Sequence, residues 1–228
     1  IPLVMSKFCF IPYARLDDLM VSYAPKGGGI GPHFDSYDVF LLQGMGSRRW
    51  QVSAQQDDRF IADAPLRILE NFQPEQEWVL ETGDMLYLPP KYAHNGIAED
   101  DCMTYSIGFR APSHDELMTQ FLVYLQDNIK TEGWYSDPDL QLQSHPSKIG
   151  TAMQSQVNSI LKKISWNRDD IENFLGIYLS EPKSHVFFER PMKPLSPRLF
   201  LQQIKRNGVQ LDLRSRLLSS RNKFFING

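Results

Sequence analysis

The chain has 228 residues, of which 42% are hydrophobic and 22% are charged, a composition typical of a globular protein long enough for a proper core. No apolar run approaches the length that a membrane-spanning helix needs, and the first residues lack the features of a signal peptide. Cys9 and Cys102 cannot build a disulfide framework and match no zinc-binding spacing, so we expect a reducing compartment, the cytoplasm.

The net charge of −3 conceals an asymmetry along the chain. Residues 181–228 carry ten Lys and Arg against three Asp and Glu, a net +7, whereas the other 180 residues carry 14 against 24, a net −10. An acidic first part favours a basic substrate or partner, and a basic tail could contact nucleic acid or an acidic surface. Both charge runs also fit ordinary solvated faces.

The first half of the chain, from Leu19 to about Arg110, is predicted to consist of short strands separated by turns. The predicted strands lie in "LMVSYAP", "YDVFLLQ", "RRWQV", "EWVL", "GDMLYLPP" and "MTYSIGFRAP". Strands at this spacing, without long helical patterns between them, indicate an antiparallel sandwich or barrel, which we place at residues 1–112.

A helical domain is predicted next, at residues 113–182. Ser113 and Glu116 form a capping-box pattern, and apolar residues then recur every four positions up to Ile129. Two further helical patterns lie in "MQSQVNSILKKI" and "DDIENFLGIYL". The fold class is therefore mainly β plus α.

The last segment, residues 183–228, is predicted to hold one short helix and two strands. Pro197 suits a first helical position and Gly208 a helix stop, and "VQLDLRSRLLSSRNKFFING" follows as two strands. A helix followed by a β-ribbon resembles part of a winged-helix unit, although an incomplete one.

The motif "HFD" places His33 and Asp35 two residues apart in a predicted strand, so that both side chains project from one face. Alone, this pair also fits a half-exposed strand with two polar residues. The later pattern "GDMLYLPPKYAH" delivers His94 to the start of a strand, 59 residues after Asp35. Two histidines and one carboxylate form the facial triad of non-haem Fe(II) oxygenases. Zinc could use similar ligands, but no other hydrolytic apparatus accompanies them.

An arginine pair follows the "GMG" turn, and a buried guanidinium beside the metal could bind a carboxylate with two hydrogen bonds. Strand alternation allows only one of Arg48 and Arg49 to face inward. Because parity across a turn is unreliable, the residues alone do not decide between the two.

The motifs "GPHFDSYDVFLLQGMGSRRWQV", "ETGDMLYLPPKYAHNG" and "YSIGFRAP" together resemble the JmjC-type 2-oxoglutarate oxygenases, and within them the bacterial ribosomal oxygenases that hydroxylate arginine. The resemblance extends from about Arg15 to Asp139. It implies a double-stranded β-helix, the cupin or JmjC barrel, with Fe(II) held by His33, Asp35 and His94. The family has a basic residue fifteen positions after the first ligand to bind 2-oxoglutarate, which selects Arg48 over Arg49, and Thr104 is implied to help.

For an arginine substrate, the resemblance implies an acid before the triad, a tyrosine after "HxD" and a serine beyond the last histidine. The matching positions are Asp18, Tyr37 and Ser106. A carboxylate pairs with the guanidinium, a ring packs on its stem, and a hydroxyl accepts one more N–H.

The predicted function is therefore hydroxylation of an arginine β-carbon in a large-subunit ribosomal protein, with Fe(II), 2-oxoglutarate and O2. The alternatives are the same chemistry on histidine, which Asp18 disfavours, and a non-catalytic cupin-like binding module. By resemblance the helical domain forms a homodimer. The chain lacks an initiator Met and is shorter than the family pattern, so we expect it to lack an N-terminal portion and to stop within or just after the wing.

Overall fold

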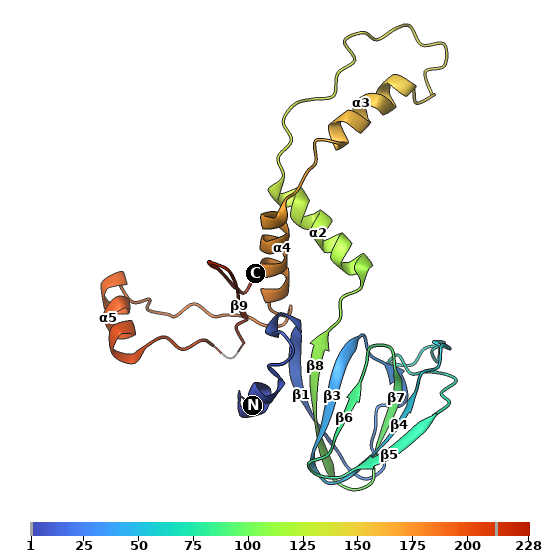
Figure 1. The fold of residues 1–228 in the computed structure, drawn as a ribbon, viewed down its shortest axis with the longest axis vertical. Coiled ribbons are helices and arrows are strands. Elements are labelled where there is room, and N and C mark those ends of the chain that lie inside the picture. The colour runs from blue at the N-terminus through green and yellow to red at the C-terminus, as the bar shows by residue number, and fades with distance from the viewer. Residues whose placement is uncertain (1, 213) are drawn as a thin grey trace. The chain divides into compact units, whose positions relative to one another are not determined.

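The computed structural model describes residues 2–212 and 214–228. The chain divides into two compact units, Ile1–Ser113 and His114–Gly228, which we call the barrel unit and the C-terminal unit. Each is described by itself (Figure 1).

Eight strands of the barrel unit form two four-stranded antiparallel sheets. The first sheet has the order β1 (Leu16–Ala24), β8 (Cys102–Arg110), β3 (Tyr37–Met45), β6 (Met85–Leu88). The second has the order β2 (His33–Phe34), β7 (Ala93–Ala98), β4 (Arg48–Ser53), β5 (Gln76–Leu80). The predicted strands are confirmed, and two such facing sheets are the arrangement of the predicted double-stranded β-helix.

Strand alternation builds the interior of the barrel unit. On β4, for example, the buried Arg48, Trp50 and Val52 alternate with the less buried Arg49 and Gln51. The rows that face inward meet in one core cluster, formed by Val39, Leu41, Trp50, Val52, Leu80 and Leu88. One face of every strand is thereby fixed toward the inside, so a polar residue in an inward row is buried among apolar neighbours.

The N-terminal segment covers the other face of the first sheet. It contains α1 (Pro2–Met5) and the 3-10 turns η1 (Ser6–Phe8) and η2 (Tyr13–Arg15). Phe8 packs there against Phe40, Ile107 and Phe109. Because both faces of this sheet are covered, its central strands are held on both sides.

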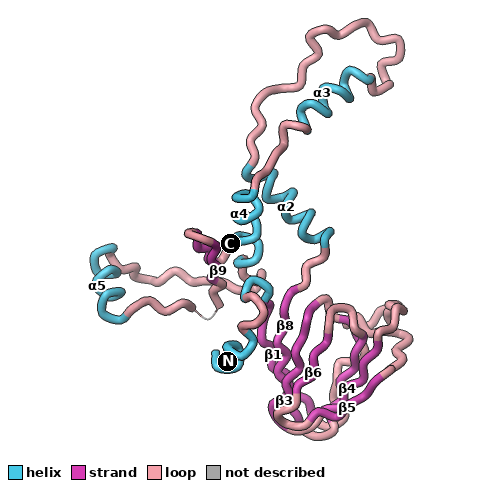
Figure 2. Tube along the Cα trace, viewed as in Figure 1, coloured by secondary structure: helices cyan, strands magenta, loops and turns pink. Residues whose placement is uncertain are grey.

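The C-terminal unit contains the helices α2 (His114–Asn128), α3 (Thr151–Leu161), α4 (Arg168–Ser180) and α5 (Pro197–Asn207) and the hairpin β9 (Leu217–Ser220) and β10 (Lys223–Ile226). All the predicted helices are present, and Figure 2 shows them joined by long loops. Pro197 opens α5 behind a Ser196 cap, and Gly208 ends it at a φ of 72°, as predicted.

Aromatic contacts and the hairpin organise this unit around α4. The Phe121 ring of α2 lies 5.1 Å from that of Phe174 on α4. On β10, Lys223 Nζ donates to Asn173 at 2.8 Å, and the Phe225 ring lies against Gly176. None of the described helices combines the length and the apolar character needed to cross a membrane.

Candidate metal centre

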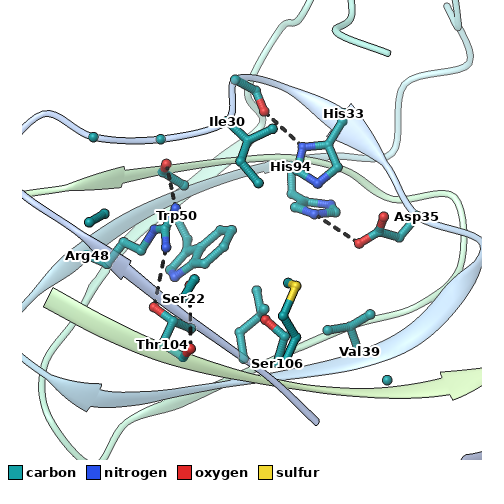
Figure 3. Close-up of a pocket in the computed structure, with 18 of the residues that line it drawn as sticks. Ser22, Ile30, His33, Asp35, Val39, Arg48, Trp50, His94, Thr104 and Ser106 are labelled. Carbon is teal, nitrogen blue, oxygen red and sulfur yellow. Dashed lines mark hydrogen bonds and ion pairs between the residues drawn. The ribbon is translucent and has the colours of Figure 1, made fainter. Parts of the chain in front are cut away.

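A cavity of about 420 Å³ opens between the two sheets of the barrel unit. The inward rows of β1, β3, β4, β7 and β8 contribute to its wall. All eight residues predicted from the sequence line it: His33, Asp35, His94, Arg48, Thr104, Asp18, Tyr37 and Ser106. Figure 3 shows Thr104 and Ser106 across the cavity from the histidines and Asp35. The two sheets therefore bring residues that are distant in sequence to one cavity. Asp18 and His94, for example, are 76 positions apart.

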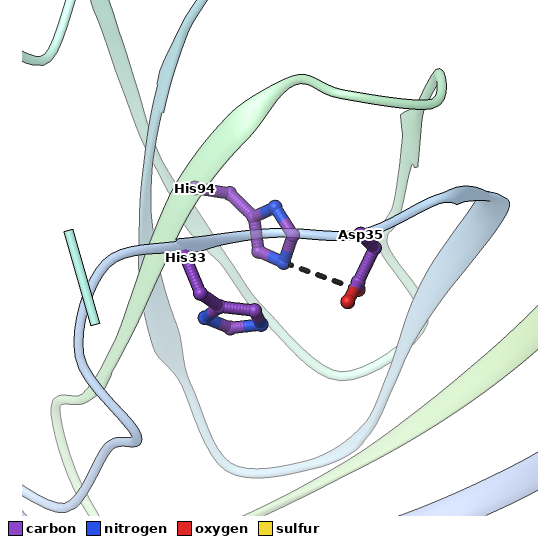
Figure 4. Close-up of side chains that lie close together, drawn as sticks. All are labelled: His33, Asp35 and His94. Carbon is purple, nitrogen blue, oxygen red and sulfur yellow. Dashed lines mark ion pairs between the residues drawn. The ribbon is translucent and has the colours of Figure 1, made fainter. Parts of the chain in front are cut away.

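The three predicted metal ligands converge at this cavity (Figure 4). His33 on β2 and His94 on β7 are directly opposite each other in the antiparallel ladder, with ring centroids 4.3 Å apart. Asp35 follows just after the end of the short β2, so "HFD" is a strand only at its first two residues. The candidate ligand atoms of the three side chains all lie within 4.8 Å of one another.

Main-chain carbonyls fix the orientation of both imidazoles. His33 Nδ1 lies 2.9 Å from the Gly31 carbonyl, and His94 Nδ1 lies 3.0 Å from the Tyr92 carbonyl. Since a carbonyl only accepts, each Nδ1 carries the proton and each Nε2 keeps a lone pair for a metal. His94 Nε2 lies 3.5 Å from an Asp35 carboxylate oxygen.

Electrostatics favour the metal-binding form of His94. This residue is only 3% exposed, and burial, together with the neighbouring His33, lowers its pKa from the usual value. A neutral imidazole, which is the form that ligates metals, is therefore stabilised. Among the residues that the structure describes, this is the only group of three or more His, Cys, Asp or Glu side chains with metal-binding geometry. Two imidazole nitrogens and one carboxylate fit Fe(II), which leaves other coordination positions for small ligands.

Arg48 is a buried cation in the same cavity, with 6% of its surface exposed. Its Nη2 donates to the Gly96 carbonyl at 3.2 Å, and its Nη1 reaches Thr104 Oγ1 at 3.5 Å. Within the described part of the chain, no carboxylate pairs with Arg48, and its buried Nε has no hydrogen-bond partner. Burial lowers the pKa of this guanidinium. The guanidinium carbon lies 4.8 Å from the centre of the Trp50 ring, a cation–π contact. A buried cation without an anionic partner is still costly, and an anionic ligand would offset that cost.

Arg49 faces the other way, which resolves the choice that the sequence left open. Its Nε donates to Glu99 at 2.5 Å and its Nη1 to Glu77 at 3.0 Å, on the outside of the sheet. The geometry therefore agrees with the selection of Arg48 as the inward arginine.

The three predicted substrate-binding residues lie on the first sheet. Asp18 is on β1, and Tyr37 begins β3. Ser106, on β8, is opposite Met20 of β1 and Leu41 of β3. An acid, an aromatic ring and a hydroxyl thus share one wall of the cavity.

Sequence reasoning missed several residues of the site. Asp17 also lines the cavity, because the register shift between Leu16 and Asp18 turns neighbouring side chains to the same space. Gly96 has no room for a side chain, since an added Cβ would lie 2.7 Å from the Trp50 ring and 2.8 Å from Arg48 Nε. A bulge and a close approach leave no periodic signal in the sequence.

The chain is similar in sequence to known proteins. A profile of the JmjC domain family matches residues 3–117. The ribosomal protein uL16 3-hydroxylase of Escherichia coli K12 is 32% identical over 211 residues, which are 92% of this chain and 57% of that protein. A probable ribosomal oxygenase of Haemophilus influenzae is 45% identical over 140 residues, which are 60% of this chain and 33% of that protein.

A solved structure matches as well. It is the Escherichia coli ribosomal oxygenase YcfD in complex with cobalt and 2-oxoglutarate, with a TM-score of 0.75 and 30% identity. The match covers 99% of this chain and 60% of that one. The chain thus spans between a third and three fifths of the lengths of these relatives.

Proposed function

The chain belongs to the JmjC domain family, and we propose from this premise that it is an Fe(II)- and 2-oxoglutarate-dependent oxygenase that hydroxylates an arginine of a large-subunit ribosomal protein. One observation carries the proposal. The His33, Asp35 and His94 cluster shares a single cavity with Arg48, a buried guanidinium that no carboxylate pairs with in the described part of the chain. A metal and a dicarboxylate together would use both features.

The residues of the cavity would have separate roles in binding the metal and the cosubstrate and in excluding water. His33, Asp35 and His94 would hold Fe(II), and Arg48 would pair with a carboxylate of 2-oxoglutarate. When bound, iron and 2-oxoglutarate supply the chemistry that inserts one oxygen atom of O2 into a C–H bond, with succinate and CO2 as coproducts. Trp50, Val39 and Leu41 line the same space with apolar surface that excludes water from it.

The substrate side of the proposal rests on Asp18, Tyr37 and Ser106. Asp18 would pair with the guanidinium of a substrate arginine, and Ser106 would accept another of its N–H groups. Tyr37 would pack against the aliphatic stem. The β-carbon of arginine as the site of hydroxylation follows from the family resemblance. Histidine is the alternative target, and a neutral imidazole would gain less from Asp18 than a permanent cation does.

The purified chain, incubated with Fe(II), 2-oxoglutarate and ribosomal proteins that include uL16, tests this function. Mass spectrometry is expected to find one added oxygen on one arginine. An added oxygen on histidine would overturn the choice of substrate and leave the oxygenase in place. No modification, together with no turnover of 2-oxoglutarate, would favour the non-catalytic binding module.

The Asp18→Asn variant tests the recognition of the substrate separately. We expect it to keep metal binding and the slow turnover of 2-oxoglutarate without substrate, because Asp18 lies outside the metal-ligand cluster. Hydroxylation of arginine is expected to fall about tenfold or more, since a charge-assisted hydrogen bond is lost. Unchanged arginine hydroxylation in Asp18→Asn would remove Asp18 from the substrate site.

The proposal extends to assembly through the second half of the chain. Residues 113–182 would form a homodimer, which the exposed Val157, Ile160 and Leu161 of α3 support. Residues 183–228, the winged-helix-like segment, would offer Arg198, Lys205 and Arg206 of α5 to an acidic surface such as nucleic acid. A ribosomal substrate would place the protein in the cytoplasm.

A further inference from the structure

A glutamine behind the cavity wall accepts a hydrogen bond from the hydroxyl of Thr104. Gln43 ends the inward row of β3, is 1% exposed and lies outside the cavity lining. Its Nε2 donates to the Met45 carbonyl at 2.8 Å and to the Gly46 carbonyl at 3.4 Å. Its Oε1 lies 3.0 Å from Thr104 Oγ1, on the neighbouring strand β8. The amide of Gln43 is thus satisfied at both ends.

The direction of these bonds follows from what each group can do. The two main-chain carbonyls only accept, so the amide nitrogen must face them and the amide oxygen must face Thr104. Thr104 has one hydroxyl proton, and donation to Gln43 uses it. The remaining lone pairs of this buried hydroxyl are left to accept, and Arg48 Nη1 lies 3.5 Å away.

This chain of bonds changes what Thr104 can do. A hydroxyl that donates to Gln43 has no proton for a ligand carboxylate, so it cannot bind an anion as a donor. As an acceptor, however, it attracts the guanidinium N–H of Arg48. The Gly96 carbonyl accepts from the other terminal nitrogen at 3.2 Å. Two acceptors, together with the Trp50 ring 4.8 Å from the guanidinium carbon, therefore orient the plane of the guanidinium.

We propose that Gln43 is a positioning residue for the cosubstrate site: it locks Thr104 as an acceptor, and Thr104 holds Arg48 in the orientation that receives the 2-oxoglutarate carboxylate. The inference rests on the proposed function, because it takes Arg48 as the carboxylate-binding group. It replaces direct contact between Thr104 and 2-oxoglutarate with an action through Arg48. Preorganisation of this kind lowers the ordering cost of binding.

The test is a double-mutant cycle on the affinity for 2-oxoglutarate. Calorimetry with Mn(II) in place of Fe(II) measures binding without turnover in the wild type, Gln43→Leu, Thr104→Val and the double variant. Each single substitution is expected to raise the Kd for 2-oxoglutarate about 5- to 10-fold, the size of one net hydrogen bond. The Kd for Mn(II) is expected to stay unchanged.

The double variant gives the decisive result. If Gln43 acts through Thr104, Gln43→Leu weakens 2-oxoglutarate binding no further in the Thr104→Val background. Independent losses that multiply, or a Gln43→Leu Kd equal to that of the wild type, would overturn the inference. Should Gln43→Leu fail to fold, Gln43→Met, which keeps the shape of the side chain, takes its place in the cycle.

Two further variants separate positioning from stability. Thr104→Ser keeps the hydroxyl and is expected to bind 2-oxoglutarate more tightly than Thr104→Val. Ser53→Ala removes another buried polar group, 1% exposed and outside the cavity lining, so it is expected to lower thermal stability without changing the Kd for 2-oxoglutarate. A wild type that binds no 2-oxoglutarate would overturn the proposed function and this inference together, whereas the cycle can overturn the inference alone.

Discussion

The two units of the chain differ in how far their apolar side chains are buried. In the barrel unit, Leu41 and Leu88 are 3% exposed and Ile107 is fully buried. In the C-terminal unit, Leu161 on α3 is 57% exposed and Leu201 on α5 is 58% exposed. The barrel therefore closes its own core and orients its own site, whereas the exposed helices of the C-terminal unit retain apolar surface that another protein surface could cover. Substitutions in the barrel unit should thus change metal binding and turnover, whereas substitutions on the helices of the C-terminal unit should change self-association.

The largest effect is expected from Asp35→Ala in the barrel unit. The variant removes the only anionic member of the candidate metal cluster. Affinity for Fe(II) is expected to fall more than about 100-fold, which exceeds the loss typical when a residue that only contacts a metal ligand is changed, and turnover of 2-oxoglutarate should cease. Metal analysis after dialysis measures the first effect. Retained iron at wild-type occupancy would show that the metal binds elsewhere.

The arginine pair provides a matched comparison of the two faces of β4. Arg48→Leu is expected to raise the Kd for 2-oxoglutarate ~10- to 100-fold, because charged hydrogen bonds in a buried site are lost. Arg49→Leu removes exposed ion pairs with Glu77 and Glu99, which solvent screens, and should leave that Kd unchanged. Calorimetry with Mn(II) measures both. Equal effects of the two variants would contradict the assigned strand parity.

The arginines also show how far the sequence alone reaches. Ligand spacing around the "HxD" motif and the "LPP" turn identified residues that the fold brings together. By contrast, the turn before Arg48 prevents a prediction of which of the two arginines faces inward. The selection of Arg48 therefore came from the family resemblance. These side chains line one cavity, and the roles assigned to them belong to the proposed function.

Other parts of the site depend on contacts that have no local pattern. Gln43 is an ordinary strand residue in "YDVFLLQ" until the fold places Thr104 across from it. Asp17 reaches the cavity only through a register shift. In the C-terminal unit, helix periodicity and caps predicted α4 and α5, but periodicity does not reveal which surfaces stay uncovered. Tertiary packing decided each of these features.

An intermediate effect is expected from Gly96→Ala, which tests how tightly the barrel holds its arginine. The new methyl group would press on Trp50 and Arg48 Nε. Overpacking should lower the free energy of unfolding by ~1–3 kcal/mol and weaken 2-oxoglutarate binding. Gly150→Ala in the C-terminal unit is the control, since its Cβ would meet open space at a φ of −75° and only the N-cap of α3 is changed. Urea denaturation compares them, and equal stabilities would show that the barrel accommodates the methyl group.

The smallest effect on chemistry is expected from a charge on α3. Ile160→Glu should weaken self-association, which analytical ultracentrifugation measures, because it buries a charge in the proposed dimer surface. The Kd for 2-oxoglutarate should remain unchanged. Asn158→Glu, an exposed polar position on the same helix, serves as the control. A monomeric wild type would refute this dimer surface, and a changed Kd in Ile160→Glu would break the separation between the two units.

Turnover of 2-oxoglutarate by the barrel unit can be measured directly as succinate formation, followed by proton NMR, with the purified chain under air. An Fe(II)- and 2-oxoglutarate-dependent oxygenase is expected to form succinate slowly, only with added Fe(II), and the Asp35→Ala variant is expected to form none. No succinate from the folded, iron-loaded wild type, or equal succinate from wild type and Asp35→Ala, would contradict this expectation.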